Sequence, residues 1–382
     1  MERAHGDGPR RGGILIAGGG TAGHVLPGLA VAAALVERGV VADRSDVHLV
    51  GSRRGVEVEL VPGAGFGLTV LGGRGIQRRL TPANVGALMG LLAGFLRAFL
   101  LMVRARPRVV LSLGGYASIP CGLAAVVLRV PLVVAEQNAV PGAANRLLGR
   151  FARASAVSFV DTALPRPELT GNPVRAAIRS AVGTRSEARA RIGVDDRPLL
   201  VAFGGSLGAR RINRAVADFV EGWRGGPLAV RHVVGARGWA AGEMARAVPA
   251  GVGYTAVAYE HDMPTLLAAA DLVVCRSGAT SVAELAVLGV PSVLVPLPGA
   301  PGDHQTANAR HLAGSGGAVL LADADLDGSA LEDLLGEILS DPPRRDAMAE
   351  AARSMARPDA ADRVVDLILR HAAGRCDDVR DA

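Results

Sequence analysis

The stretch ILIAGGGTAGH, residues 14–24, passes from a short apolar run into three consecutive glycines and a polar turn. This order predicts a buried strand at 13–17, a glycine loop at 18–24 and an alanine-rich helix from about residue 27 to 38. A strand, a glycine loop and a helix N-terminus in succession are typical of an open parallel sheet covered by helices. The stretch therefore predicts an α/β domain in which backbone N–H groups can approach a phosphate closely.

The same pattern occurs again in the second half of the chain, as PLLVAFGGSLGA at residues 198–209. Each half also contains a second strand that ends in a turn of small residues, RVVLSLGGYAS at 108–118 and DLVVCRSGATS at 271–281. Matched pairs of this kind predict two doubly wound, Rossmann-like domains that face each other across a cleft. Glycine spacing in the first loop also fits a dinucleotide-binding domain, but the acidic residue that such a domain places about 20 residues later is ambiguous.

The pattern divides the chain into five parts. We expect a disordered basic tail at 1–12, an N-terminal domain at 13–172, a linker region at 173–197, a C-terminal domain at 198–356, and a final helix with a polar tail at 357–382.

The basic residues are unusual because all 42 of them are arginine. The absence of an amine side chain excludes Schiff-base chemistry, a lysine base and a Walker-type phosphate loop. Residues 1–182 contain 21 Arg against 10 Asp and Glu, whereas residues 183–382 contain 21 against 26. The basic half is expected to meet an anionic partner, and an aromatic content of only 3% favours a membrane surface over nucleic acid. Three widely spaced cysteines suggest neither a disulfide framework nor a zinc site.

Residues 85–103 are almost wholly apolar, with Arg97 as their only charge. Three interpretations are open: a membrane-spanning helix, a core crossover helix, or a helix whose apolar stripe rests on a membrane. In the third case Leu88, Leu92, Phe95 and Phe99 would meet acyl chains.

Seven segments in fixed order resemble the MurG family, the glycosyltransferases of peptidoglycan synthesis. They are GGTAGHVLPG at 19–28, GGYAS at 114–118, EQNAVPG at 136–142, GNPVR at 171–175, GGS at 204–206, CRSGATSVAE at 275–284 and DHQTANA at 303–309. The resemblance implies a GT-B fold and an inverting transfer without a catalytic metal or other cofactor. The implied donor is UDP-N-acetylglucosamine. The implied acceptor is lipid I, a muramyl-pentapeptide linked to undecaprenyl diphosphate, and the implied product is lipid II. The implied location is the cytoplasmic face of the cell membrane. Cell-wall synthesis proteins are possible partners there.

The same resemblance assigns expected roles to individual residues. On the donor side, Glu284 suits the ribose hydroxyls, Arg175 or Arg276 the charge of the leaving UDP, and Gln305 and Asn308 the sugar hydroxyls. Further expected donor contacts are Thr21, Ala22, Gly23, Asn138, Ser206, Ala279, Thr280 and Ser281, and expected acceptor contacts are Gly19, Gly20, Gly114, Gly115 and Tyr116.

An inverting displacement needs a base on the acceptor hydroxyl, and His24 is the first candidate because its ordinary pKa is near neutrality. The alternative is a histidine that only buttresses the glycine loop. Glu136 is the second candidate, and its alternative is a carboxylate that holds loop N–H groups. Tyr116 either packs its loop or reaches the acceptor diphosphate with its hydroxyl.

Two positions depart from the family pattern: Leu207 stands where glutamine is usual, and Glu260 where an apolar residue is usual. These departures leave open a sugar-nucleotide-binding protein without activity. Three enzyme classes compete with the lipid I transferase: a GT-B transferase with another acceptor, a UDP-N-acetylglucosamine 2-epimerase and a nicotinamide-dependent dehydrogenase.

Overall fold

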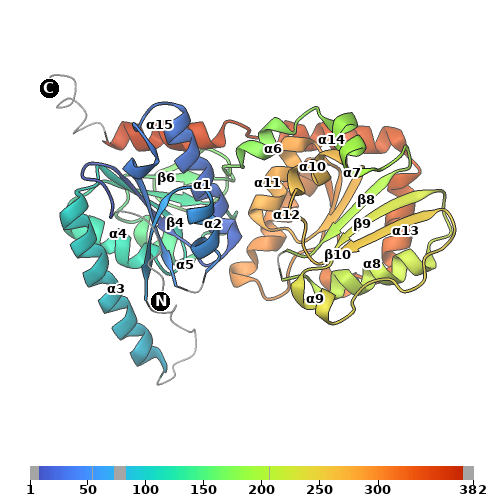
Figure 1. The fold of residues 1–382 in the computed structure, drawn as a ribbon, viewed down its shortest axis with the longest axis horizontal. Coiled ribbons are helices and arrows are strands. Elements are labelled where there is room, and N and C mark those ends of the chain that lie inside the picture. Colours follow the sequence, from blue (N-terminus) through green and yellow to red (C-terminus); the bar gives the residue numbers. More distant parts are fainter. Residues whose placement is uncertain (1–7, 54, 73–82, 206, 373–382) are drawn as a thin grey trace. The chain divides into compact units, whose positions relative to one another are not determined.

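The two glycine-loop repeats correspond to two separate parallel sheets in the computed structural model (Figure 1). The structure describes residues 8–53, 55–72, 83–205 and 207–372, without the side chains of 83–88. The N-terminal unit comprises residues 1–175 and 357–382, and the C-terminal unit comprises residues 176–356.

The N-terminal unit is built on a seven-stranded parallel sheet with the order β3-β2-β1-β4-β5-β6-β7. Its strands are β1 Ile14–Gly18, β2 Val47–Ser52, β3 Gly67–Leu71, β4 Val109–Gly114, β5 Leu132–Glu136, β6 Ala154–Val157 and β7 Pro167–Leu169. Its helices are α1 Ala22–Glu37, α2 Glu57–Gly63, α3 Ala83–Ala105, α4 Ser118–Val127, α5 Ala143–Leu148 and α15 Ala360–Ala372, with a short 3-10 helix at Arg44–Asp46.

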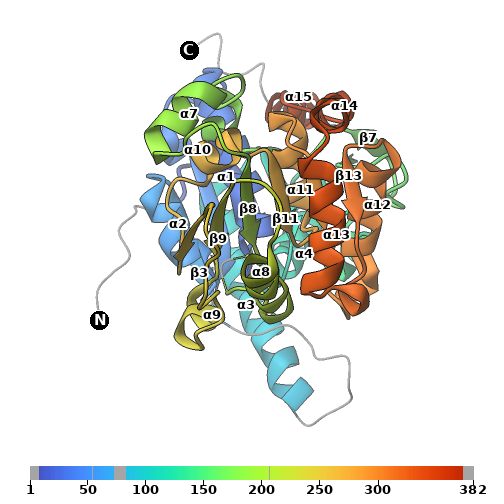
Figure 2. The same ribbon diagram turned by 90° about the vertical axis from the view of Figure 1, so that its right-hand side faces the viewer.

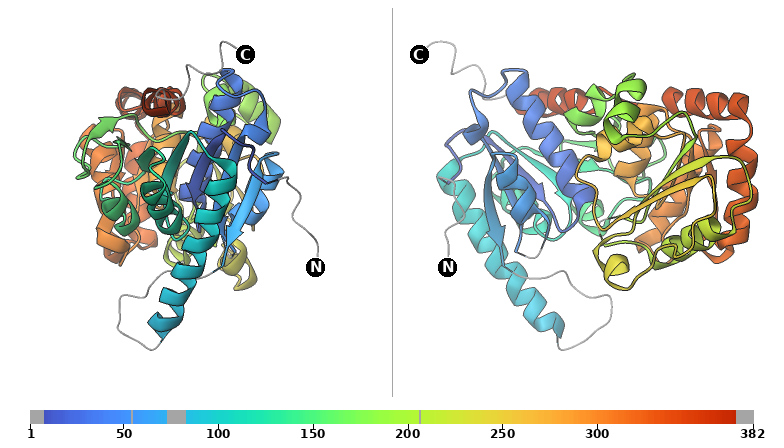
Figure 3. Two further views of the ribbon diagram at one scale, coloured as in Figure 1. Left: turned by 90° about the vertical axis from the view of Figure 1, so that its left-hand side faces the viewer. Right: turned by 45° about the vertical axis from the view of Figure 1, so that its right-hand side comes forward.

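Alternation along β1 explains how both faces of this sheet are covered. Ile14 and Ile16 pack in a core cluster with α1 and α15, whereas Leu15 and Ala17 pack in a second cluster with α3 and α4. Successive side chains of a strand point to opposite faces, so an uninterrupted apolar strand requires helices on both sides. The two views of Figure 3 show that the N-terminal part of α3 extends beyond the sheet.

The C-terminal unit has a six-stranded parallel sheet with the order β10-β9-β8-β11-β12-β13 (Figure 2). Its strands are β8 Leu199–Phe203, β9 Leu228–Val233, β10 Val252–Val257, β11 Leu272–Cys275, β12 Ser292–Leu294 and β13 Ala318–Leu320. Its helices are α6 Ala176–Ser180, α7 Arg185–Ile192, α8 Arg210–Gly222, α9 Ala236–Ala240, α10 Met263–Ala269, α11 Ala279–Leu288, α12 His304–Gly314, α13 Gly328–Leu339 and α14 Pro342–Ser354, with 3-10 turns at Pro301–Asp303 and Asp323–Asp325.

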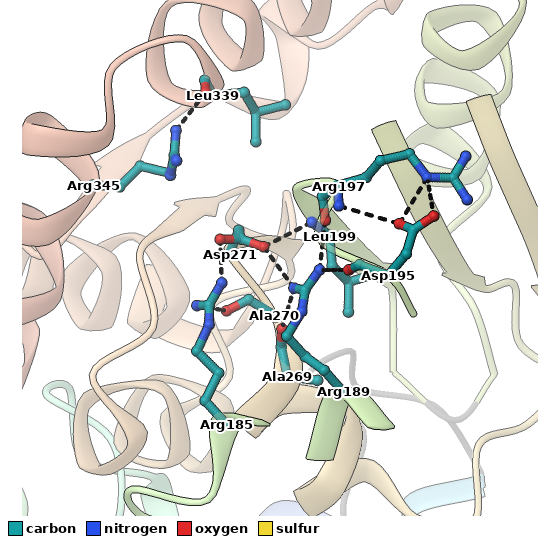
Figure 4. A network of polar contacts seen from close by, with 10 residues as sticks. All are labelled: Arg185, Arg189, Asp195, Arg197, Leu199, Ala269, Ala270, Asp271, Leu339 and Arg345. Carbon is teal, nitrogen blue, oxygen red and sulfur yellow. Dashed lines mark hydrogen bonds and ion pairs between the residues drawn. The ribbon is translucent and has the colours of Figure 1, made fainter. Parts of the chain in front are cut away.

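The expected linker region, 173–197, contains α6 and α7, and both belong to the C-terminal unit. Asp271, just before β11, fixes α7 to the sheet (Figure 4). Its carboxylate accepts hydrogen bonds from Arg189 Nη1 at 2.9 Å and from the Leu199 backbone N–H at 2.8 Å, and it also pairs with Arg185. The chain therefore passes between units at residues 175 and 176, near the start of the expected linker region, and the rest of that region is part of the C-terminal unit.

The final helix that was expected within 357–382 is α15, and both it and residue 12 are tied to the N-terminal unit. The last helix, α15, returns to the N-terminal unit, where Val364, Leu367 and Ile368 are fully buried in its core. Near the other end, Gly12 donates its backbone N–H to Ala105 O at 2.8 Å, so residue 12 is tied to the end of α3.

Candidate active site

The strand orders locate a ligand-binding edge in each unit. The direction of winding reverses between β1 and β4 in the N-terminal unit, and between β8 and β11 in the C-terminal unit. Open parallel sheets bind ligands beyond the carboxyl ends of the strands at such a reversal. The loops that follow these four strands are the glycine-rich segments singled out in the sequence.

In the N-terminal unit the two glycine loops touch. Gly114 and Gly115 have φ angles of +90° and +81°, which side chains rarely adopt. A Cβ atom on Gly115 would lie 2.5 Å from the carbonyl oxygen of Gly19. Glycine is required at position 115 both by its backbone conformation and by this close approach, so the two loops that carry the expected acceptor residues Gly19, Gly20, Gly114 and Gly115 are in direct contact.

Glu57 of α2 holds the first glycine loop through its carboxylate, and its side chain is buried, with only 1% exposed. The backbone N–H of Gly20 donates to both carboxylate oxygens, at 3.1 and 2.9 Å, and Ser52 donates its N–H and hydroxyl to Oε1 at 2.6 and 2.8 Å. A Cβ on Gly19 would lie 2.2 Å from Glu57 Oε1. The Gly20 N–H is therefore directed at a protein carboxylate, and Glu57 is a loop-positioning residue that the sequence pattern did not reveal.

His24 lies in the first turn of α1 and is half-exposed. Its Nδ1 is 3.1 Å from the Thr21 hydroxyl, and a Cβ on Gly114 would lie 3.4 Å from its Nε2. The ring thus lies over the second glycine loop, with Nδ1 held by a neighbour. This orientation is compatible with a base that uses Nε2, and also with the loop-buttress alternative.

Glu136, at the end of β5, is 3% exposed, and both of its oxygens accept hydrogen bonds. Oε1 accepts from the N–H and side-chain amide of Asn138 at 3.0 and 3.2 Å, and Oε2 accepts from Gly142 N at 2.9 Å and Asn145 Nδ2 at 2.8 Å. This geometry favours the alternative in which Glu136 holds loop N–H groups. Asn145 is a second buried participant that the sequence did not single out.

The Tyr116 hydroxyl lies 2.9 Å from the carbonyl oxygens of both Gly72 and Gly90. Burial raises the pKa of Tyr116, so the phenol stays protonated at neutral pH. Gly90 belongs to α3, and the phenol therefore links the second glycine loop to that helix. This arrangement favours packing over contact with a diphosphate.

In the C-terminal unit, α11 begins at the loop after β11. Gly278 precedes the helix, and Ala279, Thr280 and Ser281 form its first turn, where backbone N–H groups have no partner within the helix. The Thr280 hydroxyl is buried and has no hydrogen-bond partner among the described residues. Unpaired donors and the positive end of the helix dipole make this turn suitable for a phosphate group. Ser206, expected at the neighbouring loop, lies outside the described residues.

Arg276 is held inside the C-terminal unit. Its Nη1 donates to Asp323 Oδ1 at 2.6 Å and to the carbonyl oxygens of Pro296 and Val295 at 2.9 and 3.2 Å. This guanidinium forms a mostly buried ion pair, with side-chain exposures of 12% for Arg276 and 15% for Asp323. A direct contact between Arg276 and UDP would require part of this network to rearrange, whereas Arg175 is half-buried at the end of the N-terminal unit.

The remaining expected donor residues of this unit pack around the same loop. Asn308 is fully buried and donates from Nδ2 to Ser277 O at 3.1 Å. Gln305 is half-buried, and its Oε1 accepts from Leu297 N at 2.9 Å. Glu284, on α11, is 7% exposed. Asn308 and Glu284 are therefore both buried, whereas Gln305 is partly exposed.

The two departures from the family pattern have different surroundings. Glu260 pairs with Arg231 of β9 at 3.1 Å and accepts from the backbone N–H of Asp262 at 3.1 Å. The charged residue thus has an internal partner and braces its own turn. Leu207 is exposed, and nothing in the structure explains the apolar residue there.

The α3 helix exposes a different apolar stripe from the expected one. Phe95 and Phe99 pack against the core, and Leu88 lies outside the described side chains. The exposed residues follow helical spacing and are Met89, Leu92, Leu96, Leu100 and Val103. Of the expected membrane residues whose side chains the structure describes, only Leu92 is on this stripe. No helix in the described part of the chain is long and apolar enough to cross a membrane.

Comparisons with known proteins cover both units. Residues 14–157 match the glycosyltransferase family 28 N-terminal domain, and residues 199–364 match the C-terminal domain of the same family. None of the described residues forms a group of three or more His, Cys, Asp or Glu side chains that could hold a metal ion.

Two curated relatives are both named UDP-N-acetylglucosamine–N-acetylmuramyl-(pentapeptide) pyrophosphoryl-undecaprenol N-acetylglucosamine transferase. The protein from Desulforudis audaxviator is 40% identical over 93% of this chain and 97% of its own length. The protein from Alkalilimnicola ehrlichii is 41% identical over 94% and 99%.

Among solved structures, MurG from Acinetobacter baumannii superposes with a TM-score of 0.75 at 30% identity, over 94% of this chain and 99% of that one. A UDP-GlcNAc 2-epimerase from Neisseria meningitidis has a TM-score of 0.65 at 12% identity, over 94% and 100%, and shares the fold alone.

Proposed function

Because this chain belongs to the MurG family of glycosyltransferases, we propose that it transfers N-acetylglucosamine from UDP-N-acetylglucosamine to lipid I, giving lipid II in peptidoglycan synthesis. It has the GT-B fold, with one Rossmann-like sheet in each unit. The observation that carries this function is the identity of 40% over nearly the full length of a named relative. The glycine loops at the strand-order reversals of both sheets supply the matching local chemistry.

The reaction is a single displacement with inversion. The acceptor hydroxyl oxygen forms a bond to the anomeric carbon as the bond from that carbon to the UDP oxygen breaks, and the electron pair leaves with UDP. The hydroxyl proton passes to a base, for which we propose His24. Its Nδ1 is oriented by Thr21 at 3.1 Å, so Nε2 is the nitrogen that takes the proton.

The C-terminal unit binds the nucleotide sugar in this proposal. The first turn of α11, with Ala279, Thr280 and Ser281, receives the diphosphate through backbone N–H groups and the unpaired Thr280 hydroxyl. Glu284 accepts from the ribose hydroxyls, and Gln305 contacts the sugar. Arg276 does not contact UDP in this proposal. Its ion pair with Asp323 fixes the guanidinium beside the loop between β11 and α11, from where it acts on the charge of UDP at a distance.

The N-terminal unit binds the acceptor through its paired glycine loops. Thr21, Ala22, Gly23, Asn138 and Arg175 belong to this unit as well, and they are the proposed donor contacts outside the C-terminal unit. Glu136 is a positioning residue in this scheme, because both its oxygens hold the loop that carries Asn138.

A membrane location follows from the acceptor, which is linked to a lipid. We assign the membrane contact to the exposed stripe of α3, with Leu92, Leu96 and Leu100 facing acyl chains. The arginine excess of residues 1–182 supports binding to an anionic leaflet. The enzyme then acts as a peripheral protein on the cytoplasmic face of the membrane.

The decisive experiment supplies purified protein with radiolabelled UDP-N-acetylglucosamine and a short-chain lipid I analogue, with and without EDTA. We expect a labelled β-1,4 disaccharide product in both conditions. Absence of product in both conditions, in a protein that still binds UDP by calorimetry, would refute the transferase and leave a sugar-nucleotide-binding protein.

A further inference from the structure

The edge of the N-terminal sheet opposite the glycine loops carries a pocket that the proposed reaction does not use. It lies where β4, β5 and β6 begin and where α15 ends, and its volume is about 290 Å³. Four arginines and one histidine line it, and we call it the arginine pocket: Arg108, Arg129, Arg153, Arg370 and His371.

The charge of the arginine pocket is strongly positive. Glu168 pairs with one of its arginines, Arg370. Burial, together with Arg370 and Arg153, lowers the pKa of His371, so this ring is neutral at pH 7. Arg108 is fixed in place because its Nε donates to Gly12 O at 2.6 Å. Four guanidinium groups thus surround one cavity, and the Glu168 carboxylate offsets part of their charge.

The backbone at Arg129 allows the side chain to be removed without strain. Arg129 follows the end of α4 with φ +57°, in the left-handed region that glycine adopts most easily. This conformation ends α4, because the backbone N–H of Arg129 donates to Val126 O at 3.1 Å and that of Val130 donates to Ala125 O at 2.9 Å. Arg106, after α3, has φ +45° as well but does not line the pocket, so it provides a matched comparison.

We propose that the arginine pocket binds a phosphate group, as a phosphate monoester or diester. The planar fork of a guanidinium matches two phosphate oxygens, and several arginines around one cavity can bind one phosphate from different sides. A competing explanation is that the arginines only stabilise the carbonyl groups at the end of α15, where the helix dipole is negative. That explanation requires no ligand, so binding and stability measurements separate the two.

Two sources can supply the phosphate. Val127 and Phe151 are 61% and 52% exposed, and each lies two residues before a pocket arginine, Arg129 or Arg153. Exposed apolar side chains that precede the pocket arginines along the chain suit a phospholipid headgroup as the source, and this version rests on the membrane contact proposed above. A free phosphate or phosphate ester is the other source, and it is independent of that contact.

The test compares wild-type protein with Arg129→Gly and Arg153→Gln, and with Arg106→Gly as the control. Glycine suits the left-handed backbone at both 129 and 106, so neither glycine substitution should disturb the fold. One arm titrates inorganic phosphate by calorimetry at low ionic strength. The other measures cosedimentation with phosphatidylcholine vesicles that contain or lack phosphatidylglycerol.

If the source is free phosphate, Arg129→Gly should weaken phosphate binding by about tenfold, whereas Arg106→Gly should not. If the source is a headgroup, phosphate alone should not bind, and both pocket variants should lower recovery on phosphatidylglycerol vesicles clearly more than the control does, because Arg106→Gly removes a positive charge from the same basic half without touching the pocket. Equal losses for the control and the pocket variants, or no loss in either arm, would overturn the proposal. A lower Tm of the pocket variants without a change in binding would assign the arginines to α15.

The same variants are also assayed for sugar transfer to a water-soluble lipid I analogue, and their rates should equal that of the wild type. If the wild-type protein does not transfer the sugar, the proposed function is refuted. The phosphate titration and the vesicle cosedimentation would still show whether the arginine pocket binds phosphate.

Discussion

Replacing Glu57 by glutamine tests whether a buried carboxylate sets the shape of the first glycine loop. The substitution keeps the size of the side chain, and an amide oxygen in the place of Oε1 can still accept from Ser52. The new NH₂ group then takes the place of Oε2, which lies 2.9 Å from Gly20 N in the native protein, so the Gly20 N–H keeps only its longer bond, of 3.1 Å, to the oxygen at the Oε1 position. Two donors oppose each other there, and the remaining hydrogen bonds lose their charge.

A hydrogen bond to a charged group contributes about 1.5–3 kcal/mol, so Glu57→Gln should lower the free energy of unfolding by about 2 kcal/mol. Urea unfolding followed by circular dichroism measures this loss. Glu59→Gln is the control, because Glu59 lies on the same helix but is exposed, and it should change stability by less than about 0.5 kcal/mol. We also expect the kcat/KM for lipid I to fall in Glu57→Gln, while UDP affinity stays near wild type. Wild-type stability together with wild-type kcat/KM would refute the role of Glu57.

Three further predictions concern the base, the buried histidines and the membrane stripe. His24→Ala should lower kcat by about 10²-fold or more with UDP affinity nearly intact in calorimetry; wild-type turnover would leave His24 as a loop buttress. Burial lowers the pKa of His48 and of His232 from 6.5 to about 4. As the pH falls below 6.5, these histidines bind protons in the unfolded chain before they do so in the folded protein. The free energy of unfolding therefore decreases between pH 6.5 and about pH 4. At pH 5 the decrease is about 2 kcal/mol per histidine. Urea midpoints at pH 7 and pH 5 measure this loss, and an unchanged midpoint would contradict it. Leu96→Ser with Leu100→Ser should reduce flotation with anionic vesicles at unchanged Tm, because both side chains are about half-exposed, at 53% and 51%; unchanged flotation would move the contact elsewhere.

The strand and loop positions could be predicted because they depend on local pattern. An apolar run followed by glycines fixes where a strand ends, and the reversal of strand order then brings the loops after β1 and β4 to one edge. Glu57 could not be found in this way. A glutamate in the first turn of a short helix is ordinary, and only the tertiary fold shows that its carboxylate lies beneath Gly19 and Gly20.

The sequence also could not predict which face of α3 is exposed. Residues 85–103 are apolar on nearly every side, so helical periodicity does not select one face. Packing against α4 decides that Phe95 and Phe99 turn inward and that Leu96 and Leu100 turn outward. Arg276 poses the same difficulty, because a motif position identifies the residue but not the direction of its guanidinium, which here meets Asp323.

The return of α15 to the N-terminal unit has a consequence for the order in which the protein is made. Every residue of the C-terminal unit, 176–356, leaves the ribosome before α15 does. The N-terminal unit is begun first, yet the surface that Val364, Leu367 and Ile368 cover stays bare until residues 360–372 have been made. The unit translated second is therefore the first to have its whole sequence available for folding, and a nascent chain released before residue 360 would leave uncovered the apolar surface that α15 packs on, while α1 would still cover the rest of that sheet face.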